Sequence, residues 1–309
     1  MWNISGNFTF PTIYDFSLFN KTTFPIFIVF AVICWLVNIS LLITIFDDRL
    51  SCLKKSSGWF VASIGVSSII SATAVILLAM QFVSEIKIKS PVYVEASVTL
   101  IAATVTCTLC FIIILSIERL VLTAMPMRYN VFMTQTKAKS ISVLTWLLST
   151  AIGVVMLWLS RNRSEIYMYV SFPLPGVVFF VVAIDVSTFY KLMTSTNAVT
   201  RISESVVGRR NSARFRMEKR FAEVVLLLLV NFVLFACPMF VIDGLVRLDS
   251  SCKCIFVSNV PIETLYFVAL LLQQFHAANS ALFYLVLIPK YRQSLNATWK
   301  AIISYCLGN

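Results

Sequence analysis

Charged side chains are scarce in this chain of 309 residues. They make up 13% of the sequence, against about a quarter in soluble proteins, whereas hydrophobic residues make up 59% and the mean hydropathy is +0.88. This balance excludes a soluble domain. The composition predicts several helices that span a lipid bilayer.

Side chains that could carry out catalysis or bind a metal are also few. The only histidine, His276, lies in an apolar segment, and no cysteine or carboxylate stands at ligand spacing from it. The sequence shows neither a paired carboxylate site nor a nucleophile with a base. We therefore expect no metal, no cofactor and no enzymatic activity, and we interpret His276 as a core imidazole.

The eight cysteines form no disulfide framework, because four of them lie in apolar segments, where free cysteine behaves as a small hydrophobe. Cys252 and Cys254 are the only pair expected outside the membrane. The N-terminus lacks a basic leader followed by a short apolar core and a small-residue cleavage site, so no cleaved signal peptide is expected.

Residues 1–23 contain three Asn-x-Ser/Thr acceptors, at Asn3, Asn7 and Asn20. A cluster this dense predicts a glycosylated extracellular N-terminus. Two further acceptors, at Asn38 and Asn296, fall in a predicted span and in the predicted cytoplasmic tail, where glycosylation is not expected.

Seven segments are long and apolar enough to cross the bilayer, which takes about 20 residues. They form a predicted all-α integral membrane domain over residues 24–288, a bundle of seven transmembrane helices. Residues 289–309 follow as a cytoplasmic tail, in which helical spacing of apolar residues predicts a short amphipathic helix on the inner membrane surface. The predicted spans are 24–46, 58–83, 92–117, 140–160, 166–190, 221–245 and 259–288.

The net charge of +11 could indicate a nucleic-acid partner, but the distribution of basic residues favours a membrane orientation. With the N-terminus outside, 18 of the 25 lysines and arginines fall in the inner connections and the tail. Positive charge is retained on the cytoplasmic side of membranes. We therefore predict an extracellular N-terminus, a cytoplasmic C-terminus and no nucleic-acid partner.

Three carboxylates, Glu95, Asp243 and Glu263, lie near the outer ends of the third, sixth and seventh spans. Ionisable groups inside spans are candidates for function. They could line an outward-facing pocket that attracts a cationic ligand group. Alternatively, they reach lipid headgroups or pair with basic residues at the rim.

The sixth span contains Pro238, which removes a backbone hydrogen bond and predicts a kink. Phe232 lies six residues before it, at a level where a swing of the helix would repack the core, although an aromatic in a membrane helix is also ordinary packing. Asp185 lies deep in the fifth span, and it is expected to pair with a basic residue or a hydroxyl.

Glu118 and Arg119 stand side by side at the end of the third span, and Glu218 lies at the cytoplasmic end of the sixth. Across the bundle, Arg119 and Glu218 could form a partly solvated ion pair of about 1 kcal/mol, which is weak enough for a switch. The alternative is that they are independent surface charges.

These residues resemble the rhodopsin-like family of G-protein-coupled receptors. Glu118-Arg119-Leu120, followed by Pro126 and Arg128-Tyr129, is similar to the family's acidic-Arg-aromatic motif with its proline and basic-aromatic pair. Further similar positions are Asn38, Trp146, Glu218, Phe232, Pro238 and Ser280-Ala281-Leu282-Phe283-Tyr284, the last a degraded Asn-Pro-x-x-Tyr motif.

The sequence also departs from the family. Ser68 replaces the sodium-binding aspartate, Ser280 the asparagine of the seventh span, Ala236 the tryptophan before Pro238, and Leu120 the aromatic after the arginine. The customary disulfide to the second outer loop has no cysteines to form it. Two more positions speak against opsins and amine receptors, Gln274 in place of the Schiff-base lysine and Ile101 in place of the ammonium-binding aspartate.

The resemblance implies a plasma-membrane receptor that binds an extracellular ligand of unknown class and couples to a heterotrimeric G protein. Glu118, Arg119 and Glu218 would set the resting state, the sixth helix would swing outward about Pro238, and Tyr284 and Phe232 would relay the change. The alternatives are a transporter or channel, which would need converging mid-membrane charges or repeats, and a receptor-like protein that binds without signalling.

Overall fold

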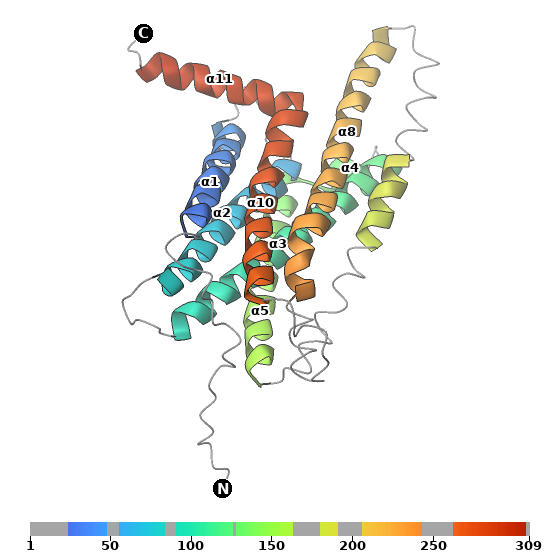
Figure 1. Cartoon of the computed structure of the whole chain (residues 1–309). Helices are drawn as coiled ribbons and strands as arrows, with labels where there is room; N and C mark the ends of the chain where they lie inside the picture. Colours follow the sequence, from blue (N-terminus) through green and yellow to red (C-terminus); the bar gives the residue numbers. More distant parts are fainter. Residues whose placement is uncertain are drawn as a thin grey trace.

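The computed structural model describes residues 24–47, 56–83, 91–125, 128–162, 180–190, 206–242 and 262–306. These stretches are helical apart from a few turn residues, and no strand occurs in them (Figure 1). The elements are α1 (Phe24–Asp47), α2 (Ser56–Val83), α3 (Pro91–Ala124), α4 (Tyr129–Phe132), α5 (Gln135–Asn162), an apolar helix Phe180–Tyr190 (yellow in Figure 1), α8 (Val206–Asn231), the π-helix η2 (Phe232–Ala236), α10 (Ile262–Leu287) and α11 (Pro289–Cys306).

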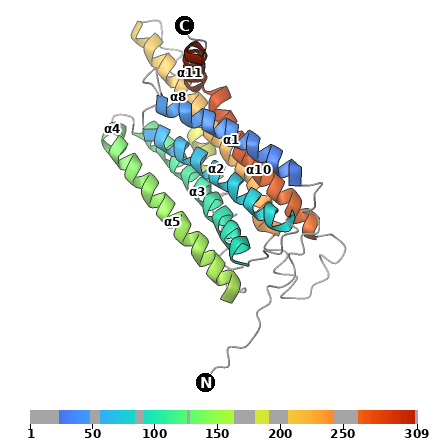
Figure 2. The same ribbon diagram turned by 90° about the vertical axis from the view of Figure 1, so that its left-hand side faces the viewer.

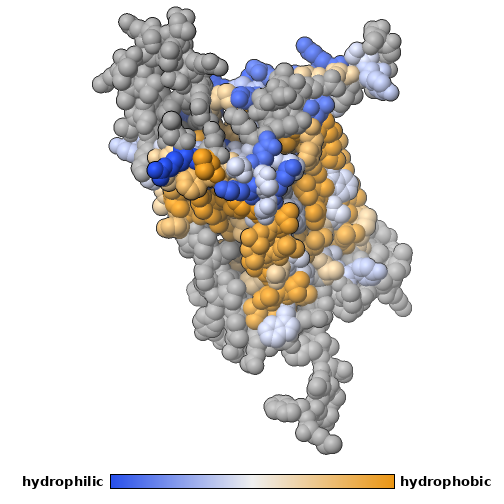
Figure 3. Space-filling model, turned by 180° about the vertical axis from the view of Figure 1, so that it is seen from behind, coloured by the Kyte–Doolittle hydropathy of each residue, from blue (hydrophilic) through white to orange (hydrophobic). Residues whose placement is uncertain are grey.

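Six of the described helices are long and apolar enough to cross a bilayer, and Phe180–Tyr190 is a shorter apolar helix within the predicted fifth span. The long helices lie side by side in two views at right angles (Figure 2). On the face seen in Figure 3, hydrophobic residues occupy the middle of the described surface, and hydrophilic residues gather towards the end where α11 lies. The predicted all-α membrane fold is confirmed.

α2 packs against α1, α3, α5 and α10, and α3 packs against α2, α5 and α8. Most of the apolar stretch of both α2 and α3 is buried, whereas α1 and α5 expose large apolar side chains, such as Leu36 and Leu147. In a bilayer these exposed side chains contact acyl chains, so their exposure carries no penalty. Buried side chains of α3 can therefore contact more than one neighbouring helix.

α3 is longer than the predicted span, because it runs to Ala124 rather than ending near residue 117. Glu118 and Arg119 consequently lie inside a helix and not in a loop. Both are buried against neighbouring helices. The additional turns of α3 thus hold a carboxylate and a guanidinium in fixed positions at one end of the bundle.

α8 loses its regular pitch at Phe232, where η2 begins. The backbone N–H of Cys237 donates to the carbonyl oxygen of Phe232, an i to i−5 hydrogen bond. Pro238 follows directly; proline has no N–H, and its ring clashes with the carbonyl four residues earlier. The wider turn before Pro238 is consistent with the missing N–H and the bulk of the proline ring. π-Turns of this kind are frequent at functional sites.

α10 ends at Leu287, and α11 starts at Pro289 in a different direction (Figure 1). α11 is fastened to α1 at two points: the Thr298 hydroxyl donates to Oδ2 of Asp47 at 2.9 Å, and the Ser294 hydroxyl donates to the Thr44 carbonyl at 3.4 Å. α11 is therefore a fixed part of the bundle.

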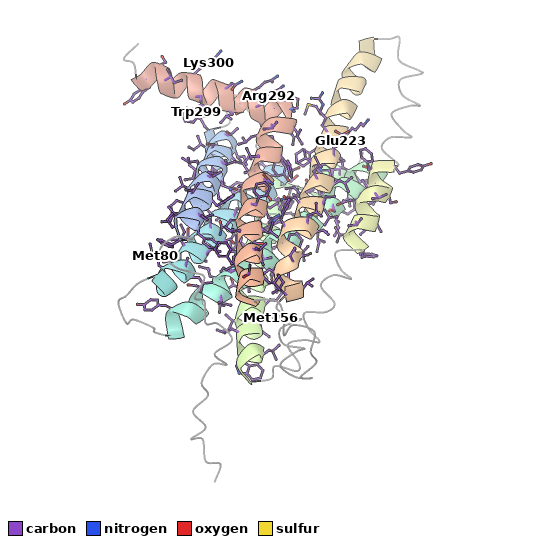
Figure 4. The ribbon with its side chains drawn as sticks, in the orientation of Figure 1. Met80, Met156, Glu223, Arg292, Trp299 and Lys300 are labelled. Atoms are coloured by element: carbon purple, nitrogen blue, oxygen red, sulfur yellow. The ribbon has the colours of Figure 1, made fainter. Side chains whose placement is uncertain are left out.

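Exposed residues of α11 are charged on one side of the helix and apolar on another. Lys300 projects from the side away from the bundle, and Trp299 projects from the opposite side (Figure 4). Trp299 is half exposed, and Ile303 beside it is exposed to a similar extent. This arrangement is that of an amphipathic helix.

The contact of α3 with α5 depends on Gly153. A Cβ atom at this position would lie 2.9 Å from the Cβ of Ala103 and 3.2 Å from the carbonyl oxygen of Thr99. We expect Gly153→Ala to push the two helices apart and to lower the free energy of unfolding by about 1–3 kcal/mol. The unfolding midpoint of the purified protein in detergent measures the change.

Gly65 provides a matched control for this prediction. A Cβ there would meet Leu42 and Asn38 at no less than 3.5 Å, an ordinary van der Waals contact. Gly65→Ala should therefore leave the midpoint unchanged or raise it slightly, since alanine favours a helix over glycine. Equal midpoints for the two variants would contradict the predicted role of Gly153.

Candidate functional site

Glu118 is fully buried and accepts hydrogen bonds from two other helices. The hydroxyls of Ser56 and Ser57, in the first turn of α2, donate to its Oε1 at 2.9 and 3.0 Å. The hydroxyl of Tyr129, the first residue of α4, donates to the same oxygen. The carboxylate thus joins α2 and α4 to α3.

Tyr129 is suited to donate because it keeps its proton. Burial and the neighbouring carboxylate of Glu118 raise the pKa of Tyr129 to about 12. At neutral pH the phenol is therefore neutral. Its oxygen also lies 2.8 Å from the hydroxyl of Ser56, which completes a ring of hydroxyl groups around one carboxylate oxygen.

Arg119 is nearly as buried as Glu118, with 6% of its surface exposed. Its Nη2 donates to the hydroxyl oxygen of Ser57 at 2.7 Å and lies 3.4 Å from Oε2 of Glu118. The guanidinium carbon lies 3.9 Å from the centre of the Phe221 ring, on α8. The guanidinium is thus held between α2 and α8.

These contacts compensate the burial of the charge in different ways. Glu118 neutralises it, Ser57 accepts one N–H, and the face of Phe221 attracts the cation, a contact worth about 2 kcal/mol when desolvated. The Phe221 ring connects the guanidinium of Arg119 to α8. A displacement of α8 would therefore change the surroundings of the guanidinium directly.

Glu218, the predicted partner of Arg119, lies in α8, and its side chain is outside the described part of the structure. It precedes Phe221 by three residues. Positions three apart are neighbours on a helix surface, so positions 218 and 221 share one face. Position 218 is therefore about one helical turn from the contact between Phe221 and Arg119.

An aromatic series continues from Phe221 to the end of the bundle. The ring of Phe221 lies 5.9 Å from that of Tyr284 on α10, which lies 5.7 Å from that of Tyr291 on α11. Tyr284 is fully buried. Three helices are thus connected by ring contacts that begin at Arg119.

Phe232 opens η2, and Pro238 lies two residues after its end. Phe232 is the first residue of η2, is fully buried and packs edge-on against the ring of His276 at 5.4 Å. Pro238 follows the π-turn. Both therefore lie where the helix is already distorted.

The predicted outer carboxylates are only partly described. Glu95 lies in α3 and Glu263 in α10, with side chains outside the description, and Asp243 lies outside the described residues, as do Asn3, Asn7 and Asn20. Asp185 is buried, and its partner is a hydroxyl, since Ser116 donates to its Oδ2 at 2.9 Å.

Four residues of this site were not predicted from the sequence: Ser56, Ser57, Phe221 and Tyr291. Serine and phenylalanine are common in membrane helices, so their types give no signal. The one available sign was position: Ser56 and Ser57 open α2, and Phe221 lies one turn from Glu218.

A search of curated proteins gives no match. The family described as 7 transmembrane receptor (rhodopsin family) matches residues 37–274, which is most of the chain. The matched region begins in α1, includes Glu118, Arg119, Phe221 and the π-turn, and ends in α10. By this match, the chain belongs to the rhodopsin family of 7 transmembrane receptors.

Proposed function

We propose that this receptor couples the binding of an extracellular ligand to a heterotrimeric G protein. The observation that carries the proposal is the enclosure of Arg119, whose buried guanidinium is held by Ser57 on α2 and Phe221 on α8. A cation enclosed in this way is exposed when one helix moves. In a receptor, a partner at the cytoplasmic face can bind the guanidinium once it is exposed.

The resting state would be set by Glu118, Arg119 and Glu218. An outward movement of α8 about η2 and Pro238 would withdraw Phe221 from the guanidinium, after which Arg119 becomes available to the G protein. Since the Phe221 ring also contacts Tyr284, the movement would change the packing of α8 against α10. Phe232 would couple the same change to His276.

The remaining predictions describe the outer half and the orientation. The receptor would lie in the plasma membrane with a glycosylated extracellular N-terminus, at Asn3, Asn7 and Asn20, and a cytoplasmic C-terminus. Its ligand would carry a cationic group if Glu95, Asp243 and Glu263 line the pocket, because carboxylates attract cations. The basic residues on the inner side support the orientation.

Removal of the Glu218 carboxylate tests the proposal without a ligand. Glu218→Gln should raise ligand-independent second-messenger production by about fivefold, the effect of removing an ion pair worth about 1 kcal/mol. The measurement is basal activity per receptor at the cell surface, in cells with several G-protein chimeras.

Glu223 is a matched control for Glu218, because it lies on the same helix, five residues further along (Figure 4). Glu223→Gln removes the same charge and should leave basal activity unchanged. Equal basal activity of Glu218→Gln and the unmodified receptor, both at the surface, would count against the proposed pair.

A further inference from the structure

Asn231 is the last residue of α8 before the π-turn, and it is buried against α10. Its side-chain nitrogen Nδ2 lies 2.7 Å from Nδ1 of His276, 3.1 Å from the backbone carbonyl oxygen of His276 and 3.4 Å from the hydroxyl oxygen of Ser280. One amide group thus contacts a full turn of the neighbouring helix.

The chemistry of these contacts fixes the hydrogen positions. A carbonyl oxygen can only accept, so the amide atom facing the His276 carbonyl must be the nitrogen. The same N–H₂ group faces Nδ1 of His276, which must therefore accept as well. The imidazole is then neutral with its hydrogen on Nε2, and the pair is a specific donor and acceptor match.

The pair also provides a second point of contact between α8 and its neighbours. Asn231 lies ten residues from Phe221 on α8, a distance of about 15 Å along a helix. α8 is thus fastened at two levels, to α3 through Arg119 and Phe221 and to α10 through Asn231 and His276. Both lie on the same side of the π-turn.

This pair was not predicted from the residue types or their spacing. His276 was expected to be a core imidazole, and Asn231 was not singled out. The ring of His276 also packs against Phe232, the next residue after Asn231, so the contact combines a hydrogen bond with apolar packing. Asn231 at the end of α8 and Phe232 at the start of η2 therefore both contact His276.

We propose that Asn231 and His276 form a latch that holds α8 against α10 and keeps the receptor in its resting state. The inference rests on the proposed function, and it adds a second restraint, independent of Glu118 and Glu218. α8 cannot leave α10 at the level of the π-turn without breaking the hydrogen bond to Nδ1. The latch thus lowers the population of the active state in the absence of ligand.

Variants that remove one partner but keep its volume test the latch. Asn231→Leu and His276→Phe should each raise ligand-independent G-protein activation by roughly two- to tenfold, as expected for the loss of one buried hydrogen bond. The reciprocal exchange, Asn231→His with His276→Asn, restores a donor and an acceptor and should return activity towards that of the unmodified receptor. A role in stability alone would not give this pattern.

Gln273→Leu serves as the control, since Gln273 is buried on α10 one turn from His276 and takes no part in the Asn231 contacts. It should leave basal activity unchanged. If Asn231→Leu does not reach the cell surface, Asn231→Ser carries the same expectation, because its short side chain cannot reach Nδ1.

The outcomes separate the latch from the proposed function. If Glu218→Gln raises basal activity while the variants of Asn231 and His276 do not, the latch is overturned and the G-protein coupling stands. If the receptor and all variants, Glu218→Gln included, activate no G protein, the proposed function fails and the latch falls with it. Increased activity in the single variants without recovery in the exchange also overturns the latch.

Discussion

Arg119→Ala is expected to lower G-protein activation by at least about thirtyfold, which corresponds to the loss of an interface residue worth about 2 kcal/mol or more. The experiment uses the Glu218→Gln background, in which activity does not depend on a known ligand. Nucleotide exchange on purified G protein measures the effect. The alanine would leave the partner without the cation that the movement of α8 uncovers.

Arg119→Lys separates charge from shape. Lysine keeps the positive charge, but it lacks the planar fork that donates to Ser57 while stacking on Phe221. In the same Glu218→Gln background, activation by Arg119→Lys should fall between that of the Glu218→Gln receptor and that of Arg119→Ala. Full activation by Arg119→Ala would show that the G protein does not use Arg119, and the proposed function would have to be placed elsewhere on the cytoplasmic face.

The membrane fold could be predicted from the sequence because each membrane-spanning helix is recognised from the hydrophobicity of its own segment. A run of about 20 apolar residues needs no knowledge of other segments. The same scarcity of charge made Glu118 and Arg119 conspicuous, since two ionised groups next to an apolar run require an explanation. Both are indeed buried, at a junction of several helices.

The partners of these charges could not be predicted, because they come from segments far apart in the chain. Ser57 precedes Arg119 by 62 residues, and Phe221 lies beyond several further helices. Which serine or phenylalanine meets Arg119 depends on helix register and crossing, neither of which periodicity provides. The expected choice between an ion pair and independent surface charges thus omitted the hydroxyl and aromatic contacts that the structure shows.

An irregular region near Pro238 was predicted from the sequence, but the form of the irregularity was not. Pro238 indicated a weak point because proline removes a hydrogen bond. The structure places a widened turn at Phe232–Ala236, before the proline. A π-turn adds no distinctive residue to a sequence, since it differs from an α-helix only in which carbonyl each N–H meets.

Glu118→Ala is expected to lower the free energy of unfolding by about 3–5 kcal/mol, the range measured when one partner of a buried ion pair is removed. Arg119 would lose its neutralising charge, and the hydroxyls of Ser56, Ser57 and Tyr129 would lose their acceptor. The unfolding midpoint in detergent measures the loss. Basal signalling of the surviving receptor should rise, because the guanidinium is less firmly held.

Glu118→Gln distinguishes the charge from the hydrogen bonds. The amide oxygen can still accept from the hydroxyl groups, whereas the amide nitrogen cannot accept from Arg119. The loss of stability should therefore be smaller than for alanine, while basal signalling should rise to a similar extent. Equal losses of stability for the two variants would mean that the charge, and not the ring of hydroxyl donors, makes Glu118 stabilising.

Variants of Ser56 and Ser57, on α2, also distinguish effects on stability from effects on signalling. Ser57 contacts both Glu118 and Arg119, whereas Ser56 contacts Glu118 and Tyr129. Ser57→Ala should therefore raise basal signalling, while Ser56→Ala should lower stability by about 1 kcal/mol without a change in signalling. If both variants signalled alike, the Ser57 contact with the guanidinium would play no part in holding the resting state, and Glu118 would act through charge alone.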